Sequence, residues 1–211
     1  MMLWYLLKKD ILIIKKYVLI MLAAAVLIPP FMLWRIPEYA GILGFMLSVI
    51  FCVLILLQYI SLKEYQFPKA ASLLCTATFS RKMMVLSLYI FCIAVYVVCC
   101  TIYTIEALII PGLDTMNAAM FFLMFLVISV LISIYLPIQY KLGYEKTKFA
   151  FTVVIIASLL PQLMKMENFN LNFLSEFSPI LICGSVLLLS CMILAVSAAL
   201  SIKFYNRTDL A

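Results

Sequence analysis

The sequence predicts an all-α polytopic membrane protein with six transmembrane helices and both termini in the cytoplasm. Hydrophobic residues make up 68% of the chain and charged residues only 11%, a composition that a soluble domain of this size does not have. The apolar residues gather in long runs, and the basic residues fall in alternate gaps between those runs. A run of about 20 apolar residues crosses a ~30 Å hydrocarbon core as a helix, which satisfies its own backbone polar groups in lipid.

Six apolar runs have the length of a span. In chain order they are Tyr17–Trp34, Gly41–Ser61, Met83–Ile110, Asn117–Pro137, Phe149–Met164 and Pro179–Ile202. The fifth run is near the short limit for a spanning helix, so its outer boundary is the least defined. Because the six runs use up residues 1–211, we predict a single transmembrane domain and no soluble nucleotide-binding or catalytic domain.

The distribution of Lys and Arg predicts the topology. Thirteen of the fifteen lie before the first run, in the gaps after the second and fourth runs, or after the sixth. The remaining gaps hold only Arg35 and Lys165. Since Lys and Arg in short loops stay in the cytoplasm, both termini are predicted to be cytoplasmic. The net charge of +6 lies beside the spans, which indicates topology and anionic lipid rather than nucleic acid as its cause.

The N-terminal segment, residues 1–16, is predicted to be an amphipathic helix on the cytoplasmic membrane surface. One helical face carries the apolar residues Leu3, Leu6, Leu7, Ile11 and Ile14. Most of the surface away from that face carries the paired lysines Lys8, Lys9, Lys15 and Lys16. A simple helical extension of the first span is an equal alternative.

The longest loop, residues 62–82, is less polar than a solvated connector. Pro68 suits the first turn of a short helix, and Ser80 can cap the third spanning helix. An apolar stripe at helical spacing lies between them: Ala70, Leu73, Leu74 and Ala77. Such a helix is a docking element for another protein, or it rests on lipid headgroups or on its own bundle. The residues alone leave these alternatives open.

The loop after the fourth run reads LPIQYKLGYEKTKF over residues 136–149. Pro137 is expected to end or kink the fourth span, because proline removes a helical hydrogen bond. Gly143 permits a turn. Four charged residues crowd this short loop: Lys141, Glu145, Lys146 and Lys148.

The residue types that enzymes need are scarce. The chain has no His, which excludes His-based zinc sites, His general bases and Ser-His triads. It has no G-x-x-x-x-G-K-[ST] motif to hold nucleotide phosphates. Six of its seven cysteines lie in apolar runs, and none forms a C-x-x-C pair, so they are interpreted as small packing residues. We therefore predict no catalytic residue, no metal site and no bound cofactor in this chain.

Three motifs resemble the small permease subunits of ABC-2 type ABC transporters of bacteria, most of all those of the phenol-soluble modulin exporters. They are LLKKDILIIKK at 6–16, FSRKMMVLS at 79–87 and LPIQYKLGYEK at 136–146. The third is the most specific, because it is similar to the family pattern L-P-x-x-Y-K-x-G-x-E-K. One departure is the sequence LCTATF before Ser80, where the family usually has a leucine followed by a proline. The resemblance extends over the whole chain in topology.

The resemblance implies a dimer of two permeases, identical or paralogous, and a separate pair of ATPase subunits that bind ATP and Mg from the cytoplasm. Loop 62–82 would then be a coupling helix that transmits ATPase closure to the bundle as rigid-body motion. Its ATPase-facing residues would be Phe67, Pro68, Ala70, Leu73, Leu74 and Ala77. A second contact would consist of Tyr140, Lys141, Gly143, Glu145 and Lys146, although this loop could instead only fix topology and bind headgroups. The expected activity is export of an amphipathic peptide or lipophilic toxin through the cell membrane.

Glu106 is the one ionisable residue well inside a predicted span. A carboxylate inside the membrane suggests a functional site, here the outer part of a translocation path that favours cationic cargo. The alternative is an interfacial Glu that reaches water near Pro111.

Two other classes of membrane protein remain as alternatives. One is the six-helix substrate-binding component of a vitamin uptake transporter, which would carry polar residues in long outer loops. The other is an ATP-independent drug carrier, which would carry paired charges in its spans or a visible repeat. Neither feature is evident in the sequence.

Overall fold

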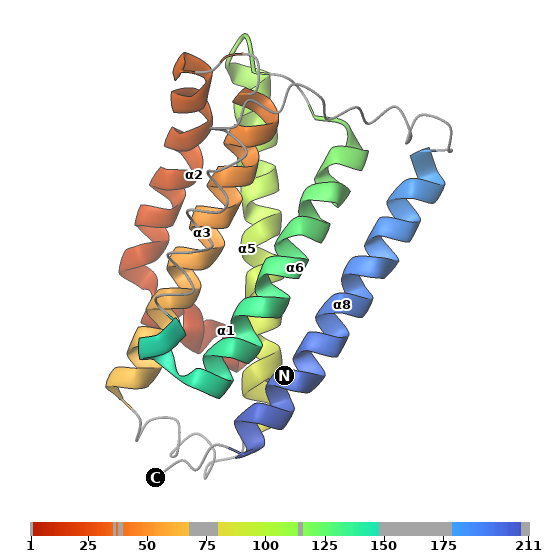
Figure 1. The fold of residues 1–211 in the computed structure, drawn as a ribbon. Coiled ribbons are helices and arrows are strands. Elements are labelled where there is room, and N and C mark those ends of the chain that lie inside the picture. Colours follow the sequence, from red (N-terminus) through yellow and green to blue (C-terminus); the bar gives the residue numbers. More distant parts are fainter. Residues whose placement is uncertain are drawn as a thin grey trace.

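The computed structural model describes residues 2–35, 37, 40–67, 80–113, 116–147 and 179–207. These residues form a helical bundle, and no strand occurs among them (Figure 1). Its helices are α1 Met2–Ile13, α2 Lys15–Arg35, α3 Ala40–Gln66, α5 Arg81–Ile109, α6 Ala118–Leu142 and α8 Pro179–Arg207. α2 packs mainly on α3 and α6 mainly on α8, while α5 contacts both pairs.

In the described part of the chain, five helices are long and apolar enough to cross a membrane. They cover Lys15–Arg35, Ala40–Gln66, Arg81–Ile109, Ala118–Leu142 and Cys183–Asn206. They confirm the first, second, third, fourth and sixth predicted spans. The fifth predicted span, residues 149–164, lies outside the described residues, and so does most of the predicted coupling helix.

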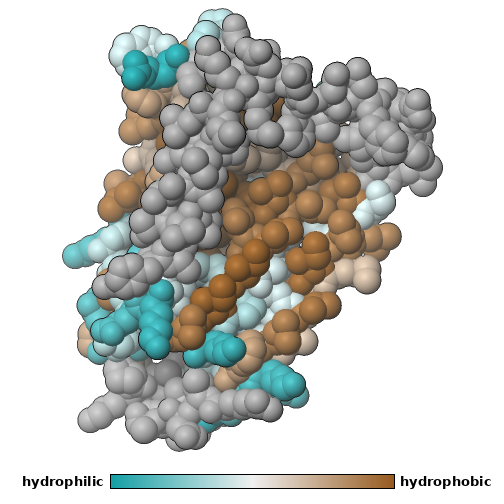
Figure 2. Space-filling view, viewed as in Figure 1, coloured by the Kyte–Doolittle hydropathy of each residue, from teal (hydrophilic) through white to brown (hydrophobic). Residues whose placement is uncertain are grey.

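One end of the bundle collects the basic segments, and we call it the basic end. It holds α1, the first turn of α5 and the C-terminal turns of α3, α6 and α8 (Figure 1). In Figure 2 the visible face is hydrophobic over its middle, and hydrophilic side chains gather towards its lower part. This distribution suits a bundle whose middle lies in lipid. That the basic end faces the cytoplasm stays a prediction from charge.

The α2–α3 pair is held by backbone groups that proline frees. Pro29 in α2 has no N–H, so the carbonyl of Ala25, four residues earlier, loses its helical partner. Ser48 of α3 donates its hydroxyl to this carbonyl, at 3.5 Å. Gly44 of α3 lets the two backbones approach, since an added Cβ there would lie 3.2 Å from the Cα of Pro29.

Replacing Gly44 with Val is expected to lower the melting temperature in detergent by several degrees. The new side chain must push α2 away from α3, and overpacking of this kind costs about 1–3 kcal/mol. Gly184→Val in α8 is the matched control, because a Cβ there meets nothing within 4 Å. Equal melting temperatures for the two variants would contradict close α2–α3 packing at Gly44.

A carbonyl that proline leaves unbonded also joins α6 to α8. This contact accompanies a correction to the expected end of the fourth span. α6 does not end at Pro137 but continues to Leu142. The carbonyl of Ser133, which Pro137 leaves without its helical donor, accepts a hydrogen bond from the Ser197 hydroxyl of α8, at 3.0 Å. Tyr89 of α5 lies 2.7 Å from Ser197 and 2.9 Å from Ser201, hydroxyl to hydroxyl. Pro137 thus creates a contact between helices instead of a helix end.

The expected roles of Ser80 as a helix cap and of Gly143 as a turn residue are confirmed. Ser80 is the N-cap of α5, and its hydroxyl accepts the Met83 N–H, at 3.4 Å. Gly143 ends α6 with φ +77°, a left-handed conformation that favours glycine. A short helical turn, residues 144–147, follows it.

α1 is a helix in its own right and not an extension of α2, because the chain turns at Ile14. Its predicted apolar face is only partly packed on the bundle. Leu6 and Ile14 are buried, but Ile11 is half exposed and Asp10 is buried in its place. The buried stripe therefore follows residues 6, 10 and 14, and it faces the bundle.

Candidate functional site

The two segments that the sequence predicts as partner contacts meet at the basic end. Tyr65, at the C-terminal end of α3, donates its hydroxyl to Oε1 of Glu145, at 2.9 Å. Its ring also stacks on Tyr144, with the ring centroids 5.6 Å apart. These contacts fix the beginning of loop 62–82 against the turn that follows α6.

The C-terminal end of α8 joins this surface. Tyr140 of α6 packs edge-on against Tyr205, with the centroids 5.1 Å apart. Lys141 places its ammonium nitrogen 5.7 Å from the ring centroid of Phe204. Arg81, the first residue of α5, donates to the backbone carbonyl of Asn206, at 3.3 Å. Side-chain contacts therefore link α3, α5, α6 and α8 at one end, so a force applied to one of these helices is transmitted to the others.

The described members of the predicted contacts are mostly accessible to a partner. Phe67 has 59% of its surface exposed, and the Lys63 ammonium lies 5.6 Å from its ring centroid. Tyr140 is half-buried. The remaining members of the second contact are exposed: Lys141, Gly143, Glu145 and Lys146. Five residues of the predicted coupling helix lie outside the described residues: Pro68, Ala70, Leu73, Leu74 and Ala77.

Sequence reasoning missed Asp10, which anchors α1 to the bundle. Its side chain is 1% exposed. Oδ1 lies 3.1 Å from the ammonium nitrogen of Lys9, and Oδ2 accepts the Ser87 hydroxyl of α5, at 3.5 Å. The signal was present in the sequence, since residues 6, 10 and 14 repeat every four residues. Asp10 is not an obvious member of a buried stripe, because burial of a carboxylate is costly.

Burial raises the pKa of the Asp10 carboxyl above its ordinary 3.8, and Lys9 and Ser87 only partly oppose this shift. Its charge also acts on titratable groups of three helices, Glu64 of α3, Cys92 of α5 and Tyr140 of α6. The folded state therefore binds the Asp10 proton more tightly than the unfolded chain does. Its contribution to stability is complete below pH 3.8 and declines as the pH rises through the raised value.

The Asp10→Asn variant is expected to melt at a higher temperature than the native protein at neutral pH, because an amide avoids the cost of a buried charge. Melting temperatures measured between pH 4 and 8 should fall with rising pH in the native chain and change less in the variant. A variant that melts lower than the native protein across this range would show that the Lys9–Asp10 ion pair stabilises α1 more than burial of the charge destabilises it.

Glu106 lies in the opposite half of α5 and is buried. Its side chain is 7% exposed, and neither carboxylate oxygen has a hydrogen-bond partner among the described residues. The aromatic cluster beside this part of α5 includes Tyr103, whose ring lies 5.0 Å from that of Phe45, centroid to centroid. The expectation that Glu106 reaches water does not agree with this burial.

The described helices define a class, the multi-pass helical membrane proteins. Residues 5–206 match the family described as ABC-2 family transporter protein, so the chain belongs to that family. It is therefore a permease component of an ABC transporter, and the family implies an ABC ATPase subunit as its partner. No curated protein and no solved structure matches the chain.

Proposed function

We propose that this chain is the permease subunit of an ATP-driven exporter that moves amphipathic peptides or lipophilic toxins out of a bacterial cell. Two permeases would form the path, and a separate ATPase pair would bind ATP and Mg in the cytoplasm. The observation that carries the proposal is the family match over residues 5–206. The motifs that are similar to those of the phenol-soluble modulin exporters support the class of cargo.

The basic end is the proposed ATPase-binding surface. Tyr65 joins the first residues of loop 62–82 to Glu145, which supports a surface shared by this loop and the second predicted contact. Arg81 joins the first turn of α5, which follows that loop, to the end of α8. Motion of the ATPase would therefore act on α3, α5, α6 and α8 together, as rigid-body coupling requires.

Glu106 is proposed to line the outer part of the translocation path. A buried carboxylate without a hydrogen-bond partner among the described residues is costly in an apolar surrounding. A passing cationic group would offset that cost. This favours amphipathic peptides that carry positive charge.

The test is transport by the reconstituted complex. We expect proteoliposomes that contain the permease and its ATPase to move a cationic amphipathic peptide only when ATP is present. An ATPase whose P-loop lysine is replaced is the control. High-affinity binding of a vitamin by the permease alone, without ATP-dependent peptide movement, would instead favour the uptake-component alternative.

A further inference from the structure

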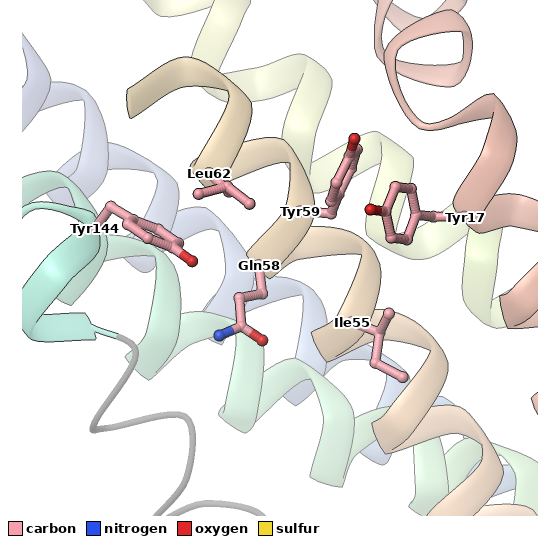
Figure 3. A pocket seen from close by; sticks show the side chains of 6 residues that line it. All are labelled: Tyr17, Ile55, Gln58, Tyr59, Leu62 and Tyr144. Carbon is pink, nitrogen blue, oxygen red and sulfur yellow. The ribbon is translucent and has the colours of Figure 1, made fainter. Parts of the chain in front are cut away.

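A hollow at the basic end opens between α2, α3 and the turn after α6. Its volume is ≈320 Å³, which is at the lower end of the range for small-molecule sites. Its lining consists of Tyr17, Ile55, Gln58, Tyr59, Leu62 and Tyr144 (Figure 3). The lining changes from apolar at Ile55 to phenolic at Tyr17 and Tyr144, as the interior of a membrane changes to its headgroup layer.

Gln58 contributes an amide to the lining of this hollow. It lies within the second span, eight residues before the end of α3, where polar side chains are rare and costly. Figure 3 shows its amide pointing away from α3, between Tyr144 on one side and Ile55 on the other. The amide is half-buried and makes no hydrogen bond to other described residues. It therefore offers donors to a ligand.

Tyrosine rings form the walls. Tyr17 and Tyr59 lie against each other with their centroids 3.5 Å apart, which joins α2 to α3. Tyr144 stacks on Tyr65, which restricts the position of its ring. Tyrosines are amphipathic and are enriched at the level of the headgroups, where the ring is apolar and the hydroxyl is wet.

Two lysines lie near tyrosines that line the hollow. The Lys63 ammonium lies 5.5 Å from the ring centroid of Tyr59 and donates to the neutral amide oxygen of Gln66, at 3.0 Å. Lys16 and Lys63 both act electrostatically on the Tyr17 phenol. Neither lysine forms an ion pair within the described part of the chain. Glu145 follows Tyr144, and it accepts the Tyr65 hydroxyl.

We propose that this hollow binds the headgroup of an anionic phospholipid from the leaflet at the basic end. The phosphate would lie near Lys63 and Lys16, with the Gln58 amide as a donor, and an acyl chain would extend along Ile55 towards the hydrocarbon core. Basic pockets between spans suit such headgroups because charge attracts the phosphate while apolar walls hold the chain. The site is independent of the transported cargo.

Native mass spectrometry of the purified protein can test this by titration with phosphatidylglycerol or phosphatidylcholine. The native chain is expected to bind the first phosphatidylglycerol more tightly than the first phosphatidylcholine. One lysine near an anionic headgroup accounts for about a fivefold change in affinity, so Lys63→Gln should weaken phosphatidylglycerol binding by about that factor. Gln58→Leu should weaken both lipids, because it removes a donor without changing charge.

Lys203→Gln is the matched control, since it removes the same charge from an exposed position of α8 at the same end. It should leave the first dissociation constant unchanged. Equal effects of Lys63→Gln and Lys203→Gln, or equal affinity for the two lipids, would overturn the proposal. Soluble glycerol phosphate should not displace the lipid at equal concentration, because it has no chain for Ile55 and Leu62 to hold. Displacement would show a site for free phosphate instead.

Discussion

Replacing Leu73 and Leu74 with Asp is expected to abolish binding of the ATPase subunit and its stimulation by the permease. Both leucines belong to the apolar stripe of loop 62–82, which is proposed to bind the ATPase. A buried carboxylate without a partner costs several kcal/mol, so two of them should weaken the complex at least ~100-fold. The measurements are copurification from membranes and ATP hydrolysis by the reconstituted pair.

The matched control for this prediction places two Asp residues on the opposite face of the same predicted helix. At 100° per residue, Ser72 and Cys75 lie about 150° from the centre of the stripe. Ser72→Asp with Cys75→Asp should leave binding within a few-fold of the native level. If both double variants lost the ATPase equally, the loop would be sensitive to charge in general and the stripe would not be the docking face.

The spans could be predicted from the sequence because each one is a local property. Twenty apolar residues in a row form a spanning helix whatever their neighbours are. Ser80 begins a helix and Gly143 ends one through local backbone geometry. The expected helix end at Pro137 does not occur, because the outcome there depends on another helix. The freed carbonyl of Ser133 is satisfied by Ser197, sixty-four residues later in the chain.

Part of the candidate site could not be predicted for the same reason. The motif residue Glu145 was found by resemblance, but Tyr65, which donates a hydrogen bond to it, belongs to no motif that was singled out. Asp10 was missed because a carboxylate in an amphipathic stripe is ordinarily assigned to solvent. Its burial depends on Ser87 and Lys9, and the contact with Ser87 exists only once α1 packs on α5.

Three polar residues of the spans join neighbouring helices. Helices in lipid gain no hydrophobic driving force from contact with each other, so close packing and interhelical hydrogen bonds hold them together. Ser48, Ser197 and Tyr89 supply such bonds here. Two of these bonds end at a carbonyl that a proline has freed, which couples the kink-prone positions of α2 and α6 to their partner helices.

Glu106→Gln is expected to lower export of cationic peptides about tenfold or more while export of a neutral peptide of equal length changes little. The substitution keeps the shape of the side chain and removes the charge that is proposed to attract cargo. Because neither oxygen has a partner among the described residues, no described hydrogen bond is lost. Melting temperature should stay level or rise, since a neutral amide is cheaper to bury than a carboxylate.

The comparison of stability with transport separates a path residue from a structural one. A Glu106 that served only the packing of α5 would, when replaced, change the melting temperature and the export of both peptides together. Glu106→Asp provides the second arm, because it keeps the charge and should retain preference for cationic over neutral cargo at a reduced rate. Unchanged export of cationic peptides by Glu106→Gln would remove Glu106 from the path, and the charge preference would then have to arise elsewhere in the dimer.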